Sequence, residues 1–113
     1  MVGMIRIAAK QPQFQAGQLV RHRRYGYRGV VVALDVRCRA DEAWYRQNRT
    51  QPDRNQPWYH VLVDGTSQVT YAAESSLKAD EEKAEMSHPL LDVYFEPFDG
   101  NRYVRNEKPW SGW

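Results

Sequence analysis

The 113-residue sequence predicts a mainly β fold, a small and partly open β-barrel with one short helical insert. Several short segments alternate two sets of side chains or are rich in β-branched residues, as is typical of strands. Glycine-containing turns separate these segments, and only one stretch has the charge pattern of a helix. A chain of this length is expected to form one domain with one core.

The first two strands are expected on either side of a glycine-containing turn. Gln18–Arg23 has alternating side chains, so we expect a strand with Leu19 or Val20 facing the core. Tyr25–Gly29 contains two glycines, which adopt the backbone angles of a tight turn at little cost. Gly29–Val36 is apolar and β-branched, which favours a central strand. The turn residues therefore lie at strand ends.

The middle of the chain is expected to form the helical insert and then a β-hairpin. Ala40–Arg49 has acidic residues near its start and arginines near its end, which complements the helix dipole and predicts about two to three turns. Thr50–Pro57 is a polar connection closed by prolines. Trp58–Asp64 alternates and predicts a strand. Asp64-Gly65 is typical of a hairpin turn, and Ser67–Ala72 is the expected return strand.

The last third of the chain is expected to be less regular. Glu74–Leu77 predicts a short helical turn, and Lys78–Ser87 predicts a solvated acidic loop because it has four acidic residues and no apolar period. Val93–Phe95 and Tyr103-Val104 predict two short strands around an Asp99-Gly100 turn. Three aromatic side chains of this region are available for packing: Phe95, Phe98 and Tyr103.

Composition excludes several classes of protein. The chain is 42% hydrophobic and 27% charged, which excludes a wholly disordered chain. Its longest apolar run, Val30–Leu34, is far shorter than the roughly 18 residues of a membrane span, and Met1–Gln13 lacks the apolar region of a signal peptide. Cys38 is the single cysteine, which excludes an internal disulfide and a multi-cysteine zinc site. We therefore expect a soluble, cytoplasmic protein with no membrane partner.

The charges are distributed unevenly along the chain. Residues 1–58 have eleven basic and four acidic side chains, a net charge of +7, whereas residues 59–113 have a net charge of −5. A basic half made mostly of arginine favours a polyanion or an acidic partner. The alternative is that this surface charge only keeps a small domain soluble.

Few residues suit catalysis or metal binding. His22, His60 and His88 are far apart, and a metal site built from the first two and a carboxylate is the weaker alternative to hydrogen-bonded histidines. Cys38 lies between two arginines, which favour a reactive thiolate, but a lone cysteine at a strand end is usually a small apolar residue. No catalytic or nucleotide-binding motif occurs. We therefore predict a protein that is not an enzyme and has no metal or cofactor.

The strongest candidate site is the segment of residues 21–28. Guanidinium groups can hold phosphate oxygens in pairs, and tyrosine rings can stack on bases or sugars. The predicted DNA-binding residues are Arg21, His22, Arg23, Arg24, Tyr25, Tyr27 and Arg28. Arginines 46, 49 and 54 of the insert could extend this surface, and the acidic residues 80–85 must point away from it or serve a second partner. The alternative is that the arginines flank a barrel strand and the tyrosines fill its mouth.

Seven sequence blocks, in order, carry a resemblance to a known family: Phe14–Arg23, Gly26–Val31, Cys38–Trp44, Pro57–Val63, Tyr71–Glu74, His88–Phe95 and Phe98–Asn106. The chain resembles the YccV-like, hemimethylated-DNA-binding family, to which the bacterial heat shock protein HspQ belongs. Its ending is similar to the longer version of the domain that is appended to some eukaryotic F-box proteins. The resemblance implies a domain over residues 14–106, with a flexible N-terminal tail at 1–13 and a C-terminal tail at 107–113.

The resemblance implies an SH3-like β-barrel with a non-enzymatic binding role. It associates the chain with hemimethylated DNA and, through HspQ, with the ATP-dependent protease Lon, whose substrate choice HspQ modifies. The insert at Asp41–Gln56 and the aromatic ending distinguish this chain from the shortest HspQ-type proteins.

Three functions are compatible with the sequence. The first is binding of double-stranded DNA, hemimethylated DNA included, through residues 21–28. The second is a heat shock or proteostasis adaptor of Lon. Exposed aromatic residues near its end would anchor a partner or a second copy of the chain: Tyr94, Phe98, Tyr103, Trp110 and Trp113. Of these, the two tryptophans are not expected to reach the core unless another segment folds over them. The third is a passive stability factor without a ligand.

Overall fold

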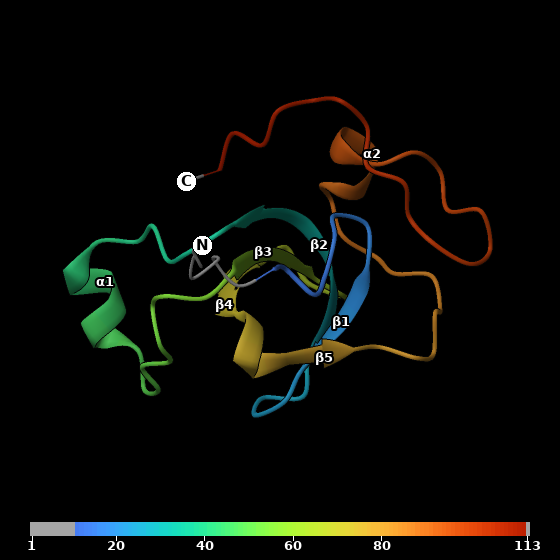
Figure 1. Ribbon diagram of the computed structural model, residues 1–113. Coiled ribbons are helices and arrows are strands. Elements are labelled where there is room, and N and C mark those ends of the chain that lie inside the picture. The colour runs from blue at the N-terminus through green and yellow to red at the C-terminus, as the bar shows by residue number, and fades with distance from the viewer. Residues whose placement is uncertain (1–10, 113) are drawn as a thin grey trace, which may run out of the picture.

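Five antiparallel strands form one curved sheet in the computed structural model, which describes residues 11–112 (Figure 1). The strands are β1 (Leu19–His22), β2 (Arg28–Asp35), β3 (Trp58–Val63), β4 (Val69–Ala73) and β5 (Leu77–Ala79). Their order in the sheet is β4-β3-β2-β1-β5, and the short 3₁₀ helix η1 (Glu74–Ser76) joins the two edge strands. The predicted partly open β-barrel is therefore confirmed.

Alternating side chains bury both faces of the interior strand β3. Tyr59 and Val61 lie in the inner core of the barrel, whose other buried members are Phe14, Val20, Val31, Ala72 and Leu77. Leu62 points to the other face and packs in a second cluster, the outer core, with residues of β1, β2 and the C-terminal segment. Because neither face is left to solvent, all six residues of β3 are buried.

The C-terminal segment covers the outer face of the sheet. In place of the predicted strand at Val93–Phe95, the short helix α2 (Leu91–Tyr94) forms, and only Phe95 pairs with Arg105 in an isolated bridge. The strand prediction was wrong because the adjacent residues Tyr94 and Phe95 are both buried in the outer core, whereas a strand would point their side chains to opposite faces. The backbone N–H of Phe95 instead donates to the carbonyl of Leu91 at 2.9 Å.

The end of the chain also packs against the barrel. After α2 the segment loops out and returns across the sheet, as the red end of the ribbon shows in Figure 1. There the ring of Trp110 lies 5.6 Å from that of His60 and 5.1 Å from that of Tyr94. Trp110 therefore reaches the core region, contrary to the expectation. Trp113 and residues 1–10 of the predicted N-terminal tail lie outside the described residues.

The helical insert is α1 (Glu42–Gln47), which is shorter than predicted. The carboxylate of Asp41 accepts the backbone N–H of Trp44 at 2.8 Å and caps the helix start. The side-chain amide of Asn48 donates to the carbonyl of Trp44 at 2.8 Å, where the backbone becomes extended, and this ends the helix. Trp44 packs edge-on against Trp58, so the insert covers the end of β3.

The strand β5 was not predicted. Leu77–Ala79 is short, and the acidic residues after it favoured a loop, but it pairs with β1 through the register of Arg21 with Lys78. Its formation depends on the free edge of β1, which the local sequence does not reveal. No helix among the described residues has the length and apolar character that crossing a membrane requires.

Candidate nucleic-acid interface at the β1–β2 turn

The backbone of the turn between β1 and β2 is held by His22. Its ring nitrogen Nδ1 accepts the backbone N–H groups of both Arg24 and Tyr25 at 3.1 Å. Its ring also stacks with the rings of Tyr25 and Tyr27, at 4.7 Å and 5.1 Å between ring centres. Gly26 adopts φ +77°, and its N–H donates to the His22 carbonyl at 2.9 Å. The turn is therefore rigid, and His22 is buried in its support instead of being presented to a ligand.

A neutral imidazole fits this role. Burial, and then the nearby charge of Arg24, lower the pKa of His22 below its ordinary value. Only the uncharged ring has a lone pair on Nδ1 to accept the two backbone N–H groups. The histidine predicted as a DNA contact is thus placed to stabilise the turn.

Two of the four predicted arginines are paired with the chain's own carboxylates. Arg21 and Arg28 are cross-strand neighbours, and both reach Asp80, at 3.3 Å and 2.9 Å respectively. Arg28 also contacts Asp64 at 2.9 Å, and its side chain is only 10% exposed. Burial alone would lower the pKa of Arg28, but its hydrogen bonds to the two carboxylates raise it. Arg28 therefore stabilises the fold, and only the partly exposed Arg21 keeps access to solvent.

The acidic loop does not point away from these arginines as a whole. The carboxylate of Asp80 is 3% exposed and lies between them, while Glu82 lies 3.9 Å from Arg21 and stays exposed. The four arginines predicted as DNA contacts therefore do not form one free patch. The carboxylates that pair with them come from the β3–β4 hairpin and from the end of β5.

The other two arginines point to solvent. Arg23 donates from Nε to the carbonyl of Leu77 at 3.1 Å, and no carboxylate of residues 11–112 forms an ion pair with its terminal nitrogens. The guanidinium of Arg24 lies 5.8 Å from the ring centre of Tyr25, which is 53% exposed. Lys78 is exposed on β5 beside Leu77. Within residues 11–112, none of these three cations forms an ion pair. We call Arg23, Arg24, Tyr25 and Lys78 the turn patch.

Only one of the three arginines of the insert adds free positive charge to the turn patch. Arg46 pairs with Glu42 at 2.8 Å, and Arg54 lies 3.9 Å from the same carboxylate and stacks over Tyr45. Arg49 is exposed and, in the described part of the chain, has no ion pair. Of the three arginines predicted to extend the surface, only Arg49 is thus available.

A groove of about 340 Å³ runs between the turn and the insert. Tyr25 and Tyr27 line one side, Trp44 and Thr50 line the other, and β4 forms the floor. The hydroxyl groups of Tyr27 and Thr70 are 2.7 Å apart, which ties the turn to that floor. Sequence reasoning missed this groove because its two sides come from separate segments.

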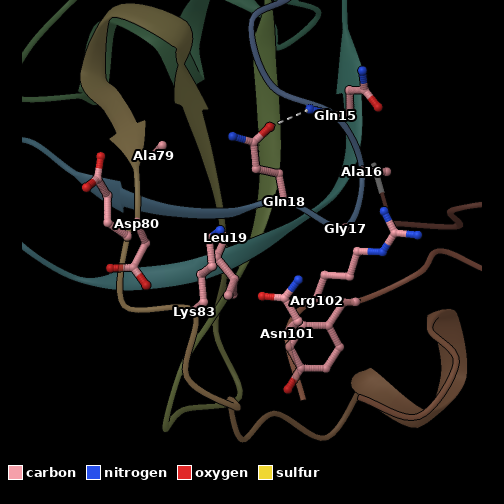
Figure 2. Close-up of a pocket in the computed structure, with 12 residues that line it drawn as sticks. Gln15, Ala16, Gly17, Gln18, Leu19, Ala79, Asp80, Lys83, Asn101 and Arg102 are labelled. Atoms are coloured by element: carbon pink, nitrogen blue, oxygen red, sulfur yellow. Dashed lines mark hydrogen bonds between the residues drawn. The ribbon is translucent and has the colours of Figure 1, made fainter. Parts of the chain in front are cut away.

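A larger cleft of about 650 Å³ lies at the other end of β1 (Figure 2). It is lined by the turn before β1, the end of β5 and the turn at Asn101-Arg102. Its charged groups have both signs, since Asp80 and Glu81 face the same cleft as Lys83 and Arg102. This mixture does not favour a polyanion.

The histidines are not grouped as a metal site. His60 lies on the outer face of β3, 3.3 Å from the carboxylate of Asp35, which also accepts the hydroxyl of Tyr71 at 2.7 Å. Burial lowers the pKa of His60 more than Asp35 raises it. His88 instead lies near Gln68, whose carbonyl is 2.9 Å from Nε2. Over the described residues, no cluster of three or more potential metal ligands occurs.

Comparison with known proteins gives the family. Residues 12–102 match the family described as hemimethylated DNA-binding protein YccV like. The chain belongs to the YccV-like family. The YccV-like chain is also similar to F-box only protein 21 of Homo sapiens, Pongo abelii and Mus musculus, with 34% identity over 96 residues in each case. These matches cover 82% of this chain and only 15% of the relatives, so it corresponds to a small part of those longer proteins.

Proposed function

We propose that this YccV-like protein binds double-stranded DNA through the turn patch. The main support for this function is a turn held by His22 that presents Arg23 and Arg24, neither of which has a carboxylate partner among residues 11–112. Arginines in this setting can each hold a phosphate, and a rigid turn loses little conformational entropy on binding. Lys78 adds a third positive charge near Arg23, which donates to the carbonyl of the preceding residue, Leu77.

Recognition of a methylated base requires an apolar contact in the major groove. Trp58 cannot supply it because it is 2% exposed, whereas Tyr25 is 53% exposed beside the two arginines. We infer that Tyr25 is the group that contacts the base or the sugar. The family's description supports hemimethylated DNA as the ligand.

A salt titration tests this function. Binding to duplexes of one sequence in unmethylated, hemimethylated and fully methylated form is measured by fluorescence anisotropy. Each phosphate contact contributes about 0.9 to the slope of log K against log salt, so Arg23→Ala with Arg24→Ala should make the slope shallower by about 1.8. Tightest binding to the hemimethylated duplex is expected, while equal affinities would retain DNA binding and remove methylation reading.

The matched control is Arg37→Ala with Arg39→Ala. Both residues are exposed and follow the end of β2 that is opposite the turn, and the variant loses the same charge. Its slope should stay near that of the unchanged protein. Unmeasurable duplex binding at low salt, or equal slopes for the two double variants, would refute the proposal.

The adaptor function remains a prediction without a defined surface. It relied on exposed aromatic residues, but Tyr94 and Tyr103 are buried, and Phe98 and Trp110 pack against the outer core. Self-association through these residues loses the same support. The DNA-binding function is the one that the described surface favours.

A further inference from the structure

The groove beside the turn patch has the chemistry of a site for a flat aromatic ligand. Tyr25 and Tyr27 stand on one side, Trp44 on the other and Tyr71 in the floor. Asn48, Thr50 and Ser76 add polar groups. Its volume, about 340 Å³, is at the lower end of the range for small-molecule sites. None of the described residues that line it is Asp or Glu.

Positive charge flanks the groove on both sides. Arg24 precedes Tyr25 on the turn, and Arg49 lies between the groove residues Asn48 and Thr50 on the insert. Neither arginine forms an ion pair in the part of the chain that the structure describes. A sugar-phosphate strand that crosses from the turn to the insert would meet a cation on each side and an aromatic groove between them.

We propose that this groove takes one unpaired nucleobase, while the strand on either side of that nucleotide contacts Arg24 and Arg49. The inference rests on the proposed function, since the turn patch would hold the neighbouring phosphates. A base paired within a duplex is stacked on both faces, so only an extruded, bulged or single-stranded nucleotide can enter. A proline-rich peptide could also use aromatic walls, but it has no phosphates to match the flanking arginines.

The test compares a paired duplex with the same duplex carrying one bulged thymine. Both bind the turn patch, but only the second offers an unpaired base, so we expect about tenfold tighter binding to it, in the range of base stacking on an aromatic ring. Trp44→Leu keeps apolar packing against Trp58 and should remove this preference, whereas Trp44→Phe keeps an aromatic face and should retain most of it. Thermal melting of both variants checks that they fold.

Two further variants separate the possible outcomes. Thr50→Glu places a carboxylate in the groove without changing a residue of either core. It should remove the preference for the bulged duplex even if both Trp44 variants are unstable. Thr50→Gln is its neutral control. Phe98→Leu, in the C-terminal segment, should leave the preference unchanged. Arg23→Ala with Arg24→Ala should weaken binding to both duplexes.

Equal affinity for paired and bulged duplexes would refute the nucleobase site and leave the proposed DNA binding intact. Failure to bind any oligonucleotide would refute both. A preference that persists in Trp44→Leu and in Thr50→Glu would place the unpaired base elsewhere and overturn the assignment. Binding of a proline-rich peptide that Trp44→Leu abolishes, together with no preference for the bulge, would assign the groove to peptides instead.

Discussion

Replacing Asp80 by asparagine should destabilise the protein markedly, because this carboxylate joins two strands of the barrel. Asp80 is 3% exposed and accepts Arg28 at 2.9 Å and Arg21 at 3.3 Å. Removing one partner of a buried ion pair costs about 3–5 kcal/mol. The asparagine keeps one carbonyl oxygen, and Arg28 keeps its contact with Asp64, so we expect a loss of about 2 kcal/mol. The partly exposed Arg21 contributes little because solvent screens it.

Urea unfolding at neutral pH measures this loss, and Glu82→Gln is the matched control. Glu82 also contacts Arg21, at 3.9 Å, but it is 68% exposed, so its replacement should change the free energy of unfolding by less than about 0.5 kcal/mol. A loss in Asp80→Asn no larger than that of the control would refute the reasoning that burial makes this pair important. A second expected effect is a steeper salt dependence of DNA binding, since Arg21 would be released beside the turn patch.

Two further predictions concern the turns. Burial, and then Arg24, lower the pKa of His22, so the unfolded chain binds the proton first and the free energy of unfolding should fall as the pH drops below 6.5. In His22→Asn the side-chain oxygen can accept the same N–H groups, so urea unfolding at pH 7.5 and 5 should show a smaller pH dependence. An unchanged dependence would contradict this prediction. Gly17 and Gly26 both have positive φ, but Gly17→Ala should lower the melting temperature far more than Gly26→Ala. A Cβ at Gly17 would clash with the carbonyl of Tyr103, whereas Gly26 faces open space. Similar melting temperatures for the two variants would contradict this prediction.

Much of the barrel could be predicted from local patterns. The alternation in β3, the glycine turn before β2 and the hairpin at Asp64-Gly65 each depend on residues close in sequence, and all three were confirmed. The insert helix was predicted from its charges, although its ends were placed too far out. β5 and α2 were missed, because each takes its form from contact with a distant segment: the edge of β1 for the first and the outer core for the second.

The candidate site shows the same division between local and distant effects. A segment with four arginines and two tyrosines at a strand end is visible in the amino-acid order, and so is the family to which the chain belongs. The order does not reveal which arginines are free. Arg28 is neutralised by carboxylates 36 and 52 residues away, while Arg23 and Arg24 have none in the part of the chain that the structure describes. Only the folded chain decides this, because charges pair according to their distance in space and not their separation along the sequence.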